Sequence, residues 1–164
     1  MATRVVERSH CAFAFEITVQ NDHPVFVALA SQKPPAHFHP YQSEYMEVLE
    51  GRLGLEIEGR DRILGPEDGQ VKVGPWTNHR MFPPPPSPDE SKRDGENARE
   101  ITRFLLSGGE TRELFRLDTV FFQNWYGYQD EVVMGGGRMD LIQVLCVGHN
   151  VSNSPAAPST RSMI

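Results

Sequence analysis

Short alternating segments separated by turn signals constrain this chain most. Within each segment, apolar side chains alternate with polar or small ones, the pattern of a strand with one buried face. Clusters of Gly, Pro, Asn and Asp interrupt the segments at intervals of about 8–12 residues, as in β-sandwiches and barrels. The segments predicted as strands are residues 11–19, 25–30, 45–49, 53–57, 62–64, 71–73 and 101–106. The chain is therefore predicted to be all-β.

Four potential metal ligands lie within this pattern. His37 and His39 are two residues apart, so on an extended backbone they point to the same face. Glu44 follows after a short spacer, and His79 comes from a later strand. Three imidazole nitrogens and one carboxylate oxygen suit a divalent first-row metal with open positions for water or substrate. The alternative is that the His-x-His spacing is accidental, since a short motif alone is only a hypothesis.

The spacing of these residues resembles the first signature of the cupin family. That signature is His-x-His, four residues, Glu, six residues and Gly, and His37, His39, Glu44 and Gly51 fill its slots. The resemblance implies a jelly-roll β-barrel. It also implies a metal held by the first three of these residues and by a histidine of the second signature.

The second cupin signature is matched less closely. Gly69, Pro75 and His79 fill its slots, whereas Thr77 stands where the family usually has Gly and Pro83 where it often has Asn. The Thr77 departure is expected to alter the turn before His79, and neither departure removes a ligand. The implied metal is Fe, Mn, Zn or Ni.

The hydrophobic period changes after the barrel. Apolar residues recur at helical spacing from about residue 111 to the glycine run at 135–137, which predicts an amphipathic helix, and a second helix is expected over 140–147. We divide the chain into a barrel, residues 1–110, two helices packed on it within 111–150, and a disordered tail, 151–164. The polar stretch 83–100 is predicted to be a mobile surface insertion, with a lid over the barrel as the alternative.

Inward-facing apolar positions of the barrel are candidates for a substrate pocket. They are Met46, Val48, Leu55, Val73 and Met81. Tyr41 and Glu44 are the candidate acid/base groups; the alternative for Tyr41 is a packed ring with its hydroxyl at the surface. The helix also has an aromatic face. We expect this face to pack against the barrel or to form a dimer interface, rather than to line a substrate pocket. Its members are Phe115, Phe121, Phe122, Trp125, Tyr126 and Tyr128.

Composition excludes several classes of partner. The 164 residues carry a formal net charge of −6, which argues against nucleic acid or an anionic membrane surface as a partner. The N-terminus has no apolar run typical of a secretory signal, and no stretch is long and apolar enough to span a membrane. Two distant cysteines, Cys11 and Cys146, fit a reducing compartment, although a disulfide between them stays open. A cytoplasmic protein is expected.

Three functions compete at this point. The segments 45–51, 75–79 and 121–128 look like those of single-domain fungal cupins associated with polyketide biosynthesis. This resemblance implies a small, fairly apolar substrate. It favours a redox-neutral tailoring enzyme that isomerises, dehydrates or cyclises that substrate. A metal-dependent dioxygenase of a phenolic or enol substrate is the second possibility, and a non-catalytic ligand-binding cupin the third. The family resemblance also implies a homodimer.

Overall fold

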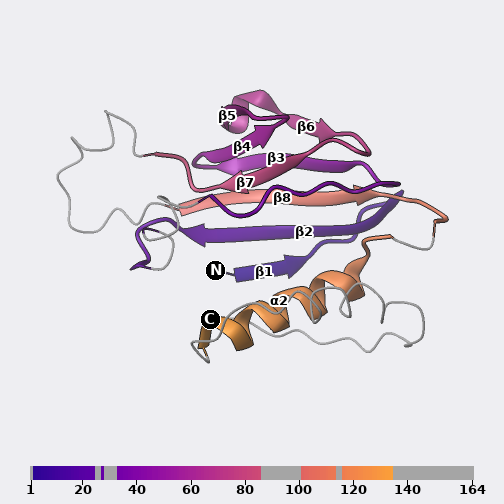
Figure 1. Cartoon of the computed structure of the whole chain (residues 1–164). Helices are drawn as coiled ribbons and strands as arrows, with labels where there is room; N and C mark the ends of the chain where they lie inside the picture. The colour runs from indigo at the N-terminus through magenta and orange to yellow at the C-terminus, as the bar shows by residue number, and fades with distance from the viewer. Residues whose placement is uncertain (1, 25–26, 28–32, 86–100, 114–115, 135–164) are drawn as a thin grey trace.

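Two antiparallel sheets form the body of the protein (Figure 1). The computed structural model describes residues 2–24, 27, 33–85, 101–113 and 116–134. One sheet has five strands in the order β1 (Ala2–Val5), β2 (Cys11–Gln20), β8 (Ile101–Gly109), β3 (Glu44–Glu50) and β6 (Gln70–Val73). The other has three, in the order β5 (Arg60–Leu64), β4 (Leu53–Ile57) and β7 (His79–Phe82). The two facing sheets form the predicted all-β jelly-roll architecture.

The hydrophobic core lies between the sheets. Phe13, Phe15 and Ile17 of β2 are each 2% exposed, and they pack in one cluster with Met46 of β3 and Leu55 of β4. The alternation of the sequence therefore assigns the buried faces of β2 and β3 correctly, whereas β4 is buried on both faces. Burial of such side chains stabilises the fold by about 1.5–3 kcal/mol each.

Two tight turns depend on a left-handed backbone. The β4–β5 hairpin turns at Glu58 and Gly59, with φ of 49° and 75°, as the sequence predicts for this Gly-containing turn. Gly51 has φ of 73°, and a Cβ at this position would collide with the carbonyl oxygen of Ile101. Glycine is therefore required at position 51 both for its backbone conformation and for the close approach of β8.

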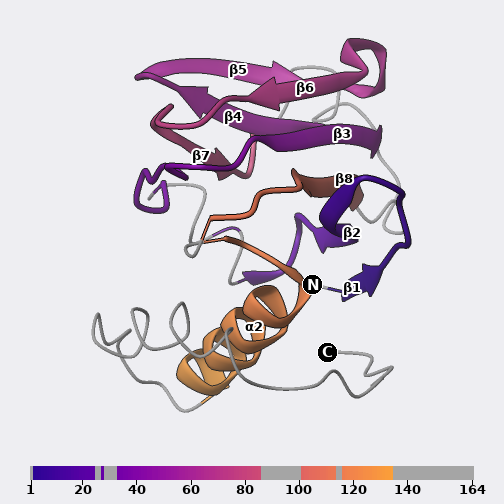
Figure 2. The same cartoon turned by 90° about the vertical axis from the view of Figure 1, so that its right-hand side faces the viewer.

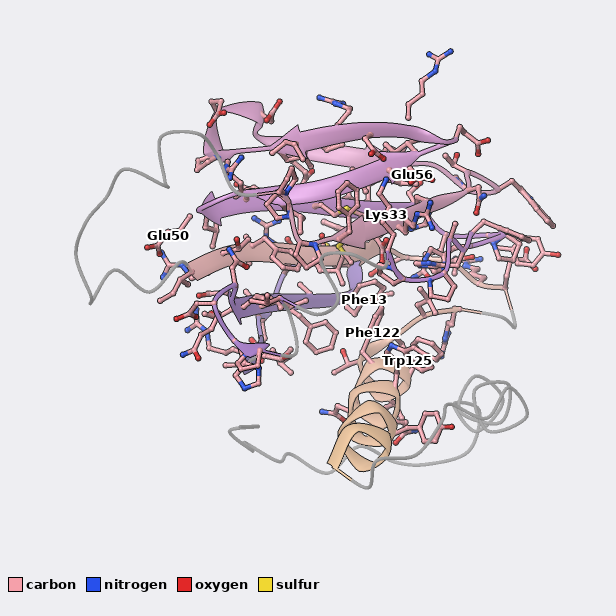
Figure 3. All side chains as sticks on the ribbon, turned by 60° about the vertical axis from the view of Figure 1, so that its left-hand side comes forward. Phe13, Lys33, Glu50, Glu56, Phe122 and Trp125 are labelled. Atoms are coloured by element: carbon pink, nitrogen blue, oxygen red, sulfur yellow. The ribbon has the colours of Figure 1, made fainter. Side chains whose placement is uncertain are left out.

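Helix α2 (Thr119–Met134) lies beside β1 and β2, at one end of the five-stranded sheet (Figure 2). Phe122 is 7% exposed, and its ring lies 4.4 Å from that of Phe13 and 5.4 Å from that of Phe15. Figure 3 shows Phe122 pointing from the helix toward Phe13. The helix is thus attached to the same core that the two sheets enclose.

The predicted start of this helix is wrong. Residues 116–118 are not helical, and α2 begins at Thr119, where Asp118 Oδ1 accepts a hydrogen bond of 2.9 Å from the Phe121 N–H. Asp118 is therefore the N-cap that fixes the beginning of the helix. Periodicity alone extended the helix too far because Leu117, which continues the apolar pattern, packs against the core from the preceding loop.

The N-terminal region differs from expectation in two places. Strand β1 was not predicted; it pairs antiparallel with β2, and its side chains are mostly exposed, so it lacks a buried apolar face. The strand predicted over residues 25–30 lies mostly outside the described residues, but Val27 is helical and donates a hydrogen bond of 3.0 Å to the His23 carbonyl. Pro24 suits the first turn of a helix because its missing N–H would have no intrahelical partner there.

Other predictions fall on residues that the structure does not describe. Most of the insertion at 83–100, the helix over 140–147 and the tail at 151–164 lie outside the described residues, as do the side chains of Phe115 and Tyr126. Among the helices described, none is long and apolar enough to cross a lipid bilayer.

Candidate metal centre

The structure brings the four predicted ligands together at one end of the space between the sheets. Glu44 is the first residue of β3 in the larger sheet, and His79 is the first residue of β7 in the smaller one. His37 forms an isolated antiparallel bridge with His79: each backbone N–H donates to the carbonyl of the other, at 2.9 and 2.8 Å. One potential ligand atom from each of His37, His39, Glu44 and His79 lies within 4.8 Å of all the others.

The segment that carries His37 and His39 is held by the loop before β7. The Trp76 N–H donates a hydrogen bond of 2.9 Å to the His39 carbonyl, and the rings of Phe38 and Trp76 stack with centroids 5.2 Å apart. Trp76 has φ of 61°, a conformation that non-glycine residues rarely adopt. The turn next to Thr77, where the sequence departs from the cupin pattern, is therefore built around a left-handed Trp76.

The tautomer of His79 follows from its hydrogen bonds. Its Nδ1 lies 2.9 Å from the Thr77 carbonyl oxygen, which can only accept, so Nδ1 carries a proton. Its Nε2 lies 2.9 Å from Glu44 Oε2. In the neutral ring this Nε2 has only a lone pair, and an ionised carboxylate also has only lone pairs to offer. The contact therefore requires a proton, on Nε2 or on the carboxyl group, or a metal ion bound by both groups.

Proton affinity differs across the cluster. Burial is the largest single influence on the pKa of His79 and lowers it. The hydrogen bond to Glu44, the Thr77 carbonyl and the Glu44 charge together outweigh burial, so the pKa is raised. Burial lowers the pKa of His39 to about 4, only partly offset by Glu44. Burial, together with the neighbouring His79, also lowers the pKa of His37. Neutral His37 and His39 have the lone pairs that a metal requires.

The donor set fits a metal ion. His39 Nε2 is buried and has no hydrogen-bond partner among the residues that the structure describes, although it lies 3.9 Å from Glu44 Oε1. Ligand atoms that share one ion at about 2.1 Å are separated by about 3–4 Å. The observed spread of up to 4.8 Å requires only a small inward adjustment of side chains. An unpaired nitrogen that faces a buried carboxylate is the arrangement that a bound cation would satisfy.

Exposure differs across the cluster. Glu44 and His79 are 3% and 1% exposed, whereas His37 lies on the exposed surface. Met46 and Val48, which follow Glu44 along β3, belong to the buried core. The exposed side of the cluster is therefore that of His37.

The predicted pocket residues and Tyr41 occupy different environments. Met46, Val48, Leu55 and Val73 are at most 3% exposed and belong to the packed core, and Met81 packs against it. Their contact with a substrate stays a prediction. Tyr41 is 46% exposed, and its ring meets Trp76 edge to face at 6.2 Å. No contact that the structure shows places its hydroxyl at the cluster, so its catalytic role also stays a prediction.

A charged network anchors the segment before His37. The Arg80 guanidinium makes a bidentate pair with Glu56 at 2.7–2.9 Å and donates to the Pro34 carbonyl at 3.2 Å. Lys33 donates to the same Glu56 at 2.9 Å, as the view of the two residues in Figure 3 illustrates. Glu56 and Arg80 are directly opposite in the β4–β7 register. The sequence did not reveal this network, because its partners are distant in the chain.

The chain is similar to several curated fungal proteins. No protein-family model matches it. It is 39% identical over 137 residues to an oxidoreductase of Arthrobotrys oligospora, covering 82% of this chain and 50% of that protein. It is 38% identical to the probable oxidoreductase patJ of Aspergillus clavatus (70% and 32% covered) and 35% identical to the epoxidase atD of Aspergillus terreus (75% and 36%). The chain thus spans between about a third and a half of these relatives.

Solved structures show a distant likeness in shape. A cupin-2 domain protein of Shewanella frigidimarina has a TM-score of 0.41 at 14% identity, covering 66% of this chain and 79% of that one. The cupin domain of Schizosaccharomyces pombe Cnp3 has a TM-score of 0.43 at 9% identity, covering 85% and 73%.

Fold and site together define a class: an all-β protein of two facing antiparallel sheets with a cluster of three histidines and one glutamate that could hold a metal ion. The two solved structures compared above are named as cupin-domain proteins. Its curated relatives are fungal proteins named as oxidoreductases or as an epoxidase.

Proposed function

We propose that this chain carries the metal centre of an enzyme that oxidises a small, fairly apolar organic substrate. One observation supports the metal centre above all others. His79 Nε2 and Glu44 Oε2 lie 2.9 Å apart, and the hydrogen bond from Nδ1 to Thr77 leaves only lone pairs between them unless a cation is present. A metal ion satisfies this pair and the unpartnered His39 Nε2 at once.

Each residue of the cluster has a distinct part in this proposal. His37, His39, Glu44 and His79 would hold the ion, which would supply Lewis-acid polarisation and, if it is a redox metal, electron transfer. The Thr77 carbonyl fixes the His79 tautomer with Nε2 toward the cluster. Glu44 has a second oxygen, Oε1, that lies 3.9 Å from His39 Nε2, too far for a hydrogen bond. That oxygen is available to accept a proton from a bound substrate.

Exposed aromatic rings support an apolar substrate. Phe38, Tyr41 and Trp76 are 48%, 46% and 64% exposed, and they lie on the two loops that carry His37, His39 and His79. The ring of Trp76 contacts both other rings, and contiguous exposed apolar patches commonly mark binding sites. A polyketide-like compound has the planar, weakly polar character that such rings would bind.

The names of the relatives favour redox chemistry over a redox-neutral reaction. The relatives compared above are called oxidoreductases or an epoxidase. Isomerisation, dehydration or cyclisation of the same substrate class, with Lewis-acid chemistry alone, stays the second candidate. The two are separated by their need for an oxidant such as O₂.

Metal content tests the first part of the proposal. We expect chelator-stripped protein to take up one Fe²⁺, Mn²⁺, Zn²⁺ or Ni²⁺ per chain, measured by elemental analysis after gel filtration. His39→Ala and Glu44→Ala should lose that stoichiometric metal, while His10→Ala, which removes a histidine outside the cluster, should retain it. Equal metal content in all four proteins would refute the metal centre.

Oxygen uptake tests the second part. The Fe²⁺-loaded protein is incubated with a panel of phenolic and enone compounds in an oxygen electrode, with anaerobic samples analysed in parallel by mass spectrometry. We expect consumption of O₂ and a product that gains oxygen or loses hydrogen. A product of unchanged mass formed without O₂ would refute the redox proposal and favour isomerisation.

A further inference from the structure

One buried amide connects the ligand loop with the segment that leads into α2. Gln42 lies between His39 and Glu44 and is 4% exposed. Its Nε2 donates to the carbonyl of Gly109 at 2.7 Å and to that of Leu117 at 2.9 Å. Its Oε1 accepts from the Leu117 N–H at 2.7 Å. Both amide protons and the oxygen are therefore satisfied by backbone groups far away in the sequence.

We propose that Gln42 is a positioning residue that sets where His39 and Glu44 lie relative to each other. The inference rests on the proposed metal-binding function. The spacer between these two residues is only four residues long, and Gln42 fixes its centre to the end of β8 and to the loop before α2. The neighbouring Ser43 carbonyl also accepts from the Gly109 N–H, at 3.0 Å.

The attachment also links the metal loop to the helix. Leu117 packs against the core two residues before α2 begins, and Phe122 of that helix is part of the core cluster. The backbone of Leu117 is thus a rigid support for the Gln42 amide. Through it, the region after the β-barrel contributes to the geometry of the cluster without contacting the ion.

No other side chain reproduces these contacts. Glutamate accepts from the Leu117 N–H but cannot donate to two carbonyls, and methionine fills a similar volume without any hydrogen bond. Loss of the amide would deprive three partly buried backbone groups of this partner, each at a cost of up to that of a lost hydrogen bond. The spacer would then relax, and His39 and Glu44 would move apart.

The test measures Co²⁺ binding to the full chain, with wild type, Gln42→Met and Asn21→Ala compared. Co²⁺ is the probe because its visible spectrum reports coordination number and geometry. Residues that orient ligands change metal affinity by about 10–100-fold when replaced. We expect Gln42→Met to unfold cooperatively, to bind Co²⁺ more weakly by about 10–100-fold and to show an altered spectrum.

Asn21→Ala is the matched control. The Asn21 amide also joins distant segments, by a hydrogen bond of 2.9 Å to Thr102 at the other end of β8, away from the cluster. It should leave Co²⁺ affinity and spectrum unchanged. A folded Gln42→Met variant with wild-type affinity and spectrum would overturn the positioning role. If Gln42→Met does not fold, Gln42→Glu is measured instead against the same expectations, because it keeps the shape and one hydrogen bond.

A second readout separates this proposal from the metal centre itself. If the wild type binds no Co²⁺, the proposed function fails. The imidazole NMR signals of His39 in metal-free protein then decide the role of Gln42. We expect these signals to shift in Gln42→Met and to stay in place in Asn21→Ala; unshifted His39 signals in the folded Gln42 variant would refute the inference.

Discussion

Acid should destabilise the metal-free protein because His39 has to stay neutral in the fold. Burial lowers its pKa from 6.5 to about 4, so between these values the unfolded chain binds a proton that the folded chain does not. Stability therefore rises with pH in this window and is lost as the pH falls. His37, whose pKa is also lowered, acts in the same direction.

The size of the effect follows from the shift of His39. One pKa unit corresponds to about 1.4 kcal/mol, so lowering the pH from about 6.5 to about 4.5 should remove about 2 kcal/mol of stability through this residue. His79 acts outside the window. Its pKa is raised, so its contribution is fully present below the unfolded value of 6.5 and is lost only as the pH rises through the folded value.

Urea unfolding of chelator-treated protein, followed by fluorescence at several pH values, measures this dependence. Carboxylates of the protein also titrate at the acid end of this range. The pH dependence of the wild type is therefore compared with that of His39→Gln, whose side chain cannot take up the proton. The wild type should lose about 2 kcal/mol more than the variant over the same interval. Gln123→Ala, at an exposed position without a titratable group, is the control and should follow the wild type. Identical pH profiles for wild type and His39→Gln would refute the reasoning.

Two further predictions concern the packing that supports the site. Phe122→Ala should reduce the free energy of unfolding by about 3 kcal/mol because it removes a buried ring from the core, whereas the exposed Gln123→Ala should change it little; urea titration measures both. Gly51→Ala and Gly59→Ala both force alanine into a left-handed backbone, which costs about 1–2 kcal/mol. Only the Cβ at position 51 collides with Ile101. Gly51→Ala should therefore destabilise the protein more than Gly59→Ala, as measured by urea titration.

Local patterns were enough to predict most strands. The alternation of apolar residues assigned the buried faces of β2 and β3, and the turn at Gly59 was visible in the sequence. It did not show that β4 is buried on both faces, with Gly54 and Glu56 buried as well as Leu53 and Leu55. Strand β1 escaped because its side chains are mostly exposed and only its pairing with β2 makes it a strand. The start of α2 was not predicted because Leu117 continues the helical period of apolar residues, whereas its backbone is hydrogen-bonded to the Gln42 side chain.

The site shows the same division between local and long-range information. Motif spacing identified the four residues that the structure brings together. It could not identify Gln42 or the pairing of Glu56 with Arg80, because these contacts join segments 75 and 24 residues apart. Nor could it show which side chains of the two sheets pack into one core, because that depends on how the sheets face each other.

The burial of Glu44 is difficult to explain by stability alone. A carboxylate that is 3% exposed loses most of its hydration, and the partner within hydrogen-bond distance that the structure describes is a single histidine. Replacing such a buried pair by apolar side chains is often neutral or stabilising, so packing provides no reason to keep it. The same carboxylate comes from the larger sheet and its histidine partner from the smaller one. A cation bound there would connect the two sheets, and because only the folded chain assembles these ligands, its binding would stabilise the whole fold.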